Sequence, residues 1–386
     1  MNEDKATKYH RQRRRAAVAS MALTGALLLG ILLSGASTAL GAWAESIGGP
    51  ASNGLARYLV AAAMFTTALF ALQEALGFPL AYYRGYALEH RYGLSRETGA
   101  EWLRDHGKAA AIGLTFALVA TVTVYAAIHT IPRWWWLIAA ALAVAAAVLL
   151  TNILPTVLLP IFYRLSPLDR AELRDRLIAL ARAQGVEALG VHVWGLGEKT
   201  RKANAALVGL GHTRRILLSD TLLAEYSDDE IEVILAHELA HHVHHDLWKA
   251  IGFEAFVALV AAWCADAARR AFGPALGIDG PQDLAALPLY LLGAAVASIL
   301  AIPIANAMSR RNERYADQFA LRLTGRPAAF ISAMRRLGAQ NLAEPRPSLL
   351  TRLIFYTHPP VEERIAQAGR AMPNAEGRTP KASMPN

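Results

Sequence analysis

Cysteine and charged residues are both scarce in this sequence. Its 386 residues include one cysteine, Cys264, so an intramolecular disulfide is excluded and any metal site must use histidine and carboxylate ligands. Charged residues make up 18% of the chain and hydrophobic residues 54%, which excludes an ordinary soluble domain. The apolar excess predicts a protein embedded in a lipid bilayer.

The positive charge does not point to nucleic acid. The formal net charge is +8 at pH 7, but the basic residues cluster beside apolar runs, where such residues set membrane topology. We therefore expect the lipid bilayer as a partner, and no nucleic acid.

Six apolar runs are long enough to cross a bilayer, for which a helix needs about 20 mostly apolar residues. They are residues 16–41, 55–77, 109–131, 134–162, 248–270 and 285–308. The first run precedes Ala42-Trp43-Ala44, which could be the small-residue cleavage site of a signal peptide. The apolar length of this run favours a retained anchor instead.

Basic loops orient these spans. The stretch from Lys5 to Arg15 and the loop 82–108 are rich in basic residues, which places both on the cytoplasmic side by the positive-inside rule. Counting the spans onward also places the segment 164–247 and the tail from Arg310 on the cytoplasmic side. The Arg269-Arg270 pair does not fit this topology, because it lies at the outer end of the fifth span. We expect a multi-pass protein of a bacterial-type cytoplasmic membrane.

The segment 164–247 has the pattern of a soluble α/β unit. Apolar residues at helical spacing predict a helix over 169–184, and short apolar runs predict strands at 191–194 and 215–218. Ser227 to Glu230 forms a capping box, which predicts the start of a further helix.

That helix carries two histidines with the spacing of zinc ligands. In His237-Glu238-Leu239-Ala240-His241 the imidazoles lie four residues apart on one helix face, so both can reach one ion. Glu238, beside the first histidine, can then contact a metal-bound water as general base. The motif is short enough to occur by chance, and a catalytic zinc needs a third protein ligand and one open position.

A candidate for the third ligand follows the sixth span. Glu313 and Asp317 share a helix face, and we expect Glu313 to complete the zinc shell while Asp317 accepts the other ring proton of His237. The alternative is that both acids belong to a solvated helix face with Arg310 and Arg314. The HExxH-type motif upstream favours the metal site, with one Zn²⁺ per chain.

Two further segments have a functional and an ordinary interpretation. The stretch from Arg201 to Ala205 is either a turn or an edge strand that holds an extended substrate by main-chain hydrogen bonds. The stretch from His358 to Arg364 is either a loop that leads into a helix or the source of two donors, His358 and Arg364, that stabilise an oxyanion.

Together these residues resemble the type I CAAX prenyl endopeptidase family, membrane zinc proteases also related to bacterial heat-shock membrane proteases. The resemblance covers roughly residues 55–370 as an ordered series of motifs. They are Phe78-Pro79-Leu80, Glu89 to Leu94, Leu159 to Leu168, Asn204-Ala205, Ser219 to Leu223, the two metal motifs and His358-Pro359-Pro360.

The resemblance implies a fold and a set of roles. The fold is a mainly α integral membrane protein, with about six transmembrane helices around a chamber and a cytoplasmic zincin-type α+β metallopeptidase domain. His237, His241 and Glu313 are then the ligands and Glu238 is the base. Asn204 and Ala205 border the substrate strand, and His358 and Arg364 lie in the active site. Eukaryotic members have a seventh, amino-terminal span, where this chain has a basic segment.

The expected domains follow the spans. They are a basic tail (1–15), a membrane domain with four transmembrane helices (16–163), a metallopeptidase domain interrupted by two spans (164–370) and a disordered tail (371–386).

The expected reaction is metal-assisted hydrolysis of peptide bonds at the cytoplasmic membrane face. The expected substrate is a peptide or protein, with lipidated or membrane-embedded ones as candidates. Two alternatives remain open at this stage: a general quality-control protease for membrane proteins, and a non-catalytic carrier with a structural zinc. Glu238 argues against the carrier, because a structural site needs no carboxylate beside the water position.

Overall fold

The computed structural model describes residues 4–209 and 211–370, apart from the side chains of residues 51, 152, 154, 155 and 212. The expected disordered tail, 371–386, lies outside these residues. The chain is mainly helical, as predicted. The α-helices are α1 (Lys5–Leu33), α2 (Ala36–Ile47), α3 (Leu55–Tyr82), α4 (Leu88–Arg91), α5 (Gly99–Thr130), α6 (Trp135–Ile153), α7 (Leu159–Phe162), α8 (Ala171–Ala183), α9 (Asp220–Glu225), α10 (Asp228–Val243), α11 (Asp246–Phe272), α12 (Leu287–Thr324), α13 (Pro327–Gln340), α14 (Leu349–Phe355) and α15 (Val361–Arg370).

The long helices form the membrane part. Five helices of the described chain are long and apolar enough to cross a membrane, and the number is six if the pair Trp135–Thr151 and Thr156–Phe162, bent by 56°, is counted as one span. The bend contains a π-helical turn, η3 (Leu154–Leu158), and a second such turn, η2 (Tyr83–Ala87), follows α3. The predicted mainly α membrane fold is confirmed.

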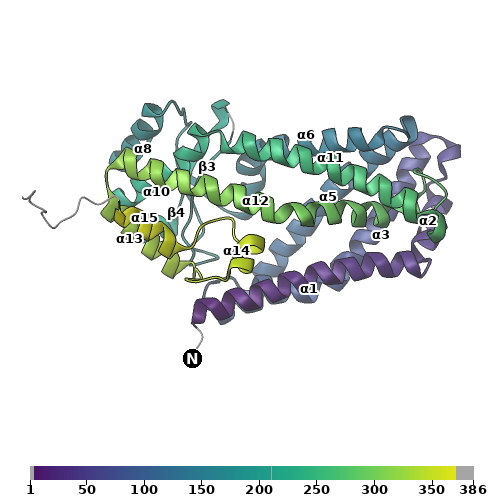
Figure 1. The fold of residues 1–386 in the computed structure, drawn as a ribbon, viewed down its shortest axis with the longest axis horizontal. Helices are drawn as coiled ribbons and strands as arrows, with labels where there is room; N and C mark the ends of the chain where they lie inside the picture. Colours follow the sequence, from purple (N-terminus) through teal and green to yellow (C-terminus); the bar gives the residue numbers. More distant parts are fainter. Residues whose placement is uncertain (1–3, 210, 371–386) are drawn as a thin grey trace, which may run out of the picture.

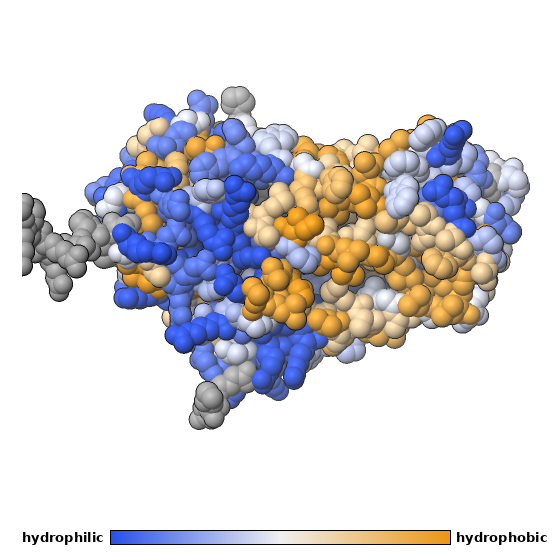
Figure 2. All heavy atoms as spheres, in the orientation of Figure 1, coloured by the Kyte–Doolittle hydropathy of each residue, from blue (hydrophilic) through white to orange (hydrophobic). Residues whose placement is uncertain are grey.

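Hydrophobic and hydrophilic surface residues occupy different parts of the molecule along its long axis. Figure 1 shows the long helices side by side, with the sheet and helices α8, α10, α13 and α15 gathered at one end. In Figure 2 hydrophobic side chains cover the long helices, and the end that holds the sheet is mainly hydrophilic. An apolar belt of this kind fits the hydrocarbon core of a bilayer.

A small mixed sheet supports the hydrophilic end. Its strands are β1 (Leu165–Pro167), β2 (Val191–Trp194), β3 (Ala205–Val208) and β4 (Arg215–Ser219), in the order β1-β2-β4-β3. β2 and β4 pair in parallel, and the other two pairs are antiparallel. The predicted strands at 191–194 and 215–218 are confirmed, whereas β1 was not expected. β3 is an edge strand.

The ends of two helices differ from the predicted spans. α1 begins at Lys5, so the basic stretch is a continuation of the first span, and it ends at Leu33 rather than at 41 because Gly35 adopts a left-handed φ of 75° before α2. α12 continues as one helix from Leu287 to Thr324, well beyond the expected 308. It therefore connects the membrane part to the hydrophilic end.

Arg269 and Arg270, whose positive charge at the outer end of a span does not fit the predicted topology, both pair with Asp266. Arg269 Nη2 lies 3.3 Å from Asp266 Oδ1, and Arg270 Nη2 lies 3.1 Å from Asp266 Oδ2. Both ion pairs lie within α11, so the two arginines are held on their own helix.

Candidate metal centre

The helix with the histidine motif begins as predicted. Ser227 caps α10: its hydroxyl accepts a hydrogen bond from the Glu230 backbone N–H at 3.3 Å, and the Glu230 carboxylate accepts one from the Ser227 N–H at 2.8 Å. This reciprocal pair satisfies two helix-terminal donors. The rest of α10 is buried against α12 and the sheet, so the motif sits on a rigid helix.

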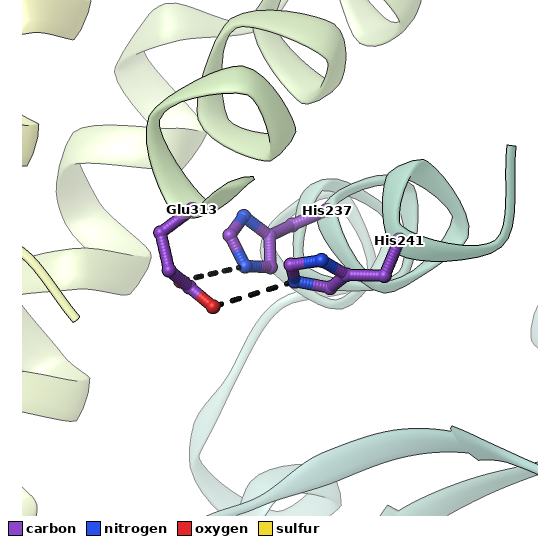
Figure 3. Close-up of side chains that lie close together, drawn as sticks. All are labelled: His237, His241 and Glu313. Atoms are coloured by element: carbon purple, nitrogen blue, oxygen red, sulfur yellow. Dashed lines mark ion pairs between the residues drawn. The ribbon is translucent and has the colours of Figure 1, made fainter. Parts of the chain in front are cut away.

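Three side chains converge from α10 and α12. His237 Nε2 lies 3.2 Å from Glu313 Oε2, and His241 Nε2 lies 3.4 Å from Glu313 Oε1. One ligand atom from each lies within 4.8 Å of the other two. Figure 3 shows the carboxylate and both rings turned toward one another.

These residues fit a metal ion. Glu313 Oε2 is buried, and within the described residues no hydrogen bond of good geometry reaches it, although His237 Nε2 lies 3.2 Å away. A buried anionic oxygen without a well-directed donor suits a metal ligand. Two neutral imidazoles and one carboxylate also match the His₂Glu set of catalytic zinc sites.

A buried network orients His237. Its Nδ1 lies 2.9 Å from Asp317 Oδ1, as the sequence predicted for this pair. Arg364 holds the same carboxylate through two hydrogen bonds, from Nε to Oδ2 at 2.9 Å and from Nη2 to Oδ1 at 2.5 Å. In this structure Arg364 therefore neutralises Asp317, while it also lines the cleft beside Glu238.

A second carboxylate, which the sequence reasoning missed, orients His241. Asp246 Oδ2 lies 2.9 Å from His241 Nδ1, and its Oδ1 accepts a hydrogen bond from Lys249 Nζ at 2.9 Å. The chain reverses at His245, which has a left-handed φ of 55° and precedes α11. Such a backbone is uncommon for a residue other than glycine, and helical periodicity alone would not reveal this contact.

Local environment shifts the pKa values of the motif. Burial opposes protonation of His237, but the nearby carboxylates of Asp317 and Glu313 outweigh it and raise its pKa to about 9. Burial also raises the pKa of Glu238, which moves its carboxylate toward the range useful for a general base.

The other expected site residues line one cleft. A cavity of about 390 Å³ is bordered by His237, Glu238, Asn204, Ala205, His358 and Arg364. His358 Nε2 lies 3.3 Å from Glu313 Oε1, so it approaches the metal ligands from the opposite wall. The structure thus brings together every residue singled out for the site.

The edge strand turns part of its backbone to this cleft. The Asn204 carbonyl accepts a hydrogen bond from the Ser219 N–H at 2.9 Å, which ties Asn204 to the neighbouring strand. Because backbone groups alternate along a strand, those of Ala205 face the other side. Ala205 is therefore placed to pair with an extended peptide.

The fold and the site together define a class of protein: an integral-membrane metallopeptidase. Comparison with known proteins identifies its family. Residues 167–371, more than half of the chain, match the family described as Peptidase family M48. Residues 2–164 match the family described as CAAX prenyl protease N-terminal, five membrane helices.

The chain belongs to peptidase family M48 and is a membrane metalloendopeptidase. It is 28% identical to the uncharacterized metalloprotease YhfN of Bacillus subtilis over 74% of this chain and 68% of that protein. It is 26% identical to CAAX prenyl protease 1 of Saccharomyces cerevisiae over 78% of this chain and 70% of that protein. The crystal structure of S. mikatae Ste24p shares the fold, with a TM-score of 0.80, 21% identity, and coverage of 94% of this chain and 87% of that one.

Proposed function

We propose that this protein is a zinc endopeptidase with one Zn²⁺ per chain, held by His237, His241 and Glu313. The observation that carries the proposal is the convergence of these three side chains beside Glu238, in a cleft bordered by an edge strand. When bound, zinc polarises a carbonyl and lowers the pKa of a bound water to about 7.

The protein's own groups then position substrate and move protons. The backbone of Ala205 would pair with the peptide, and Glu238 would accept the proton of the attacking water and donate it to the leaving nitrogen. His358 lies across the cleft, where it would hydrogen-bond the developing oxyanion. Arg364 would contribute positive charge from its place on Asp317.

We further propose that the active site faces the cytoplasm of a bacterial-type membrane. The basic amino-terminal end of α1 and the hydrophilic end with the metal centre lie together (Figure 1), and basic segments remain on the cytoplasmic side.

We propose lipidated or membrane-embedded proteins as the substrates. A second cavity of about 590 Å³, mostly apolar, lies on the other side of the metal centre between β3 and the membrane helices. Its lining includes Leu150 of α6, Leu207 of β3 and Leu247 of α11. The relatives named CAAX prenyl protease 1 point to the same class of substrate.

The metal assignment can be tested by elemental analysis of the purified protein. We expect one zinc per wild-type chain and loss of that zinc in His237→Ala, His241→Ala and Glu313→Ala. Full zinc content in Glu313→Ala would remove Glu313 from the ligand set.

A further inference from the structure

The short helix α14 turns apolar side chains outward and its charged side chain inward. Leu349, Leu350 and Leu353 are 72%, 67% and 37% exposed. Arg352 lies on the inner side, where its Nη2 donates to Glu363 Oε2 at 2.7 Å and its side chain is 28% exposed. A helix on a surface in water has the opposite arrangement, with its apolar side toward the core. We call the three exposed leucines the leucine face, and its direction indicates an apolar surrounding.

The leucine face continues the apolar surface of the long helices. In Figure 1 α14 lies beside α12, where the hydrophilic end meets the long helices, and in Figure 2 the same place is a hydrophobic patch that joins the apolar belt. That belt is the surface which an integral membrane protein buries in lipid. The leucine face therefore meets lipid acyl chains. With seven residues α14 is too short to cross a bilayer, so it would lie in the plane of the interface.

Two buried side chains of α12, Asn306 and Arg310, hold the carboxyl-terminal end of α14. Between them Asn306 Nδ2 and Arg310 Nη1 donate four hydrogen bonds of 2.6–3.1 Å to backbone carbonyl oxygens, which belong to Arg352, Leu353, Ile354 and Tyr356. The last carbonyls of a helix have no partner within it, and these side chains supply one. We call Asn306 and Arg310 the α12 clamp.

The α12 clamp connects α14 to the metal centre. Asn306, Arg310 and Glu313 are spaced four and three residues apart, so they share one face of α12. Glu313 Oε1 lies 3.3 Å from His358 Nε2, and His358 follows the end of α14 after only two residues. A shift of α14 relative to α12 would therefore move His358 relative to Glu313.

We propose that α14 is an in-plane membrane anchor that positions His358. The leucine face inserts among the acyl chains of the leaflet next to the hydrophilic end, and the α12 clamp transmits the depth of the helix to the cleft. The bilayer thus holds the group that would hydrogen-bond the oxyanion. The lipid contact does not depend on the proposed reaction, whereas the effect through His358 rests on it.

The lipid contact can be measured without turnover. On a Cys264→Ser background, Leu350→Cys carries an environment-sensitive fluorophore, and the protein is reconstituted in phosphatidylcholine vesicles that contain lipids with a nitroxide at a shallow acyl-chain carbon. We expect these lipids to quench the label at position 350. The matched control is Asp175→Cys, an exposed position on α8, whose label should keep its fluorescence. An unquenched label at position 350 would overturn the anchor.

Two other occupants of the leucine face give different results. If the label were shielded from the nitroxide lipids and two chains cross-linked through Leu350→Cys, the face would be a contact between copies of this chain. If a lipidated reporter peptide abolished the quenching, the face would bind substrate. Either result would make the proposal wrong.

Leu350→Asn tests the link to His358, because a polar side chain is costly among acyl chains and should draw α14 toward water. His358 would act on the oxyanion and not on the bound substrate. We therefore expect kcat for a soluble reporter peptide in vesicles to fall about 10- to 100-fold while KM stays unchanged. Leu350→Met, which keeps an apolar side chain of similar size, is the matched control and should keep the wild-type kcat.

A double-mutant comparison separates positioning from general damage. In a His358→Ala background, Leu350→Asn should cause no further loss of kcat, since the group that it displaces is already missing. Zinc content and thermal stability of each variant show whether a loss reflects misfolding. An unchanged kcat in Leu350→Asn, or the same loss with and without His358, would overturn the coupling. A wild-type protein that cleaved no peptide would overturn the proposed function and the coupling, while the quenching measurement would still decide the lipid contact.

Discussion

Asp317 contacts the proposed metal ligand His237 and Asp246 contacts the proposed ligand His241, and replacement of each carboxylate by asparagine should have different consequences. In each case the ring Nδ1 of a histidine lies 2.9 Å from a carboxylate oxygen. Asparagine keeps an acceptor but loses the charge, so the imidazole becomes less basic. Groups of this kind typically account for about a 10- to 100-fold difference in metal affinity or activity. We expect both variants to bind zinc more weakly by that order.

Asp317→Asn and Asp246→Asn should differ in the thermal stability of the folded protein. Asp317 neutralises Arg364, whose side chain is only 12% exposed, whereas the Lys249 partner of Asp246 is 51% exposed. Removing one member of a buried pair typically costs about 3–5 kcal/mol, while an exposed pair contributes about 0–1 kcal/mol. Asp317→Asn should therefore lower the melting temperature of the metal-free protein, and Asp246→Asn should leave it nearly unchanged.

The assay is a zinc competition titration against a chelator, together with thermal unfolding in detergent of metal-free and loaded protein. Asp279→Asn, at an exposed position in the connection between α11 and α12, serves as the matched control and should behave as wild type. Added zinc should restore activity to Asp246→Asn. Wild-type zinc affinity in Asp246→Asn would refute the orienting role assigned to Asp246.

Three other predictions concern catalysis, pH and topology. Glu238→Gln should retain zinc and thermal stability but lose about 10²–10⁴-fold in peptide cleavage; wild-type turnover, with contaminating proteases excluded, would contradict its role as base. Burial alone would raise the pKa of Glu344, but the hydrogen bonds from Arg14 and Tyr356 outweigh it and lower that pKa. The stability advantage over Glu344→Gln in thermal unfolding should therefore be full above the ordinary pKa of about 4.3 and disappear as the pH falls below it. Cysteine labelling at position 175, where the Asp175 side chain is 70% exposed, on a Cys264→Ser background should require permeable cells. Labelling from outside intact cells would reverse the topology.

Local patterns in the sequence predicted the membrane spans and the histidine helix. Hydropathy locates a span because each one needs about 20 apolar residues, and the capping box at Ser227 marks a helix start through its own side chains. The zinc-ligand spacing of His237 and His241 is equally local. These features depend on residues close together in the chain, so they can be read without the fold.

Contacts that depend on how the chain turns and packs could not be predicted in the same way. Asp246 reaches His241 only because the chain reverses at His245, and a left-handed residue of that type has no strong sequence signal. The sequence predicted Arg364 in the active site, where it lines the cleft, but no sequence pattern indicated that its guanidinium would also hold Asp317. The position of Arg14 against Glu344 depends on how α1 packs, which no short pattern specifies.

The placement of the third ligand ties the metal centre to the membrane. His237 and His241 lie on α10, in the hydrophilic end, whereas Glu313 lies on α12, which is continuous with a membrane span. A segment limited to 164–247 would hold two imidazoles and lack the carboxylate that a catalytic zinc site of this type requires. The site therefore forms only when α12 is inserted and packed against α10. The same packing places the candidate metal centre next to the apolar cavity, because His241 lines that cavity together with Leu150 of α6 and Leu247 of α11. On the proposed function, a membrane-attached substrate would reach the centre from this side.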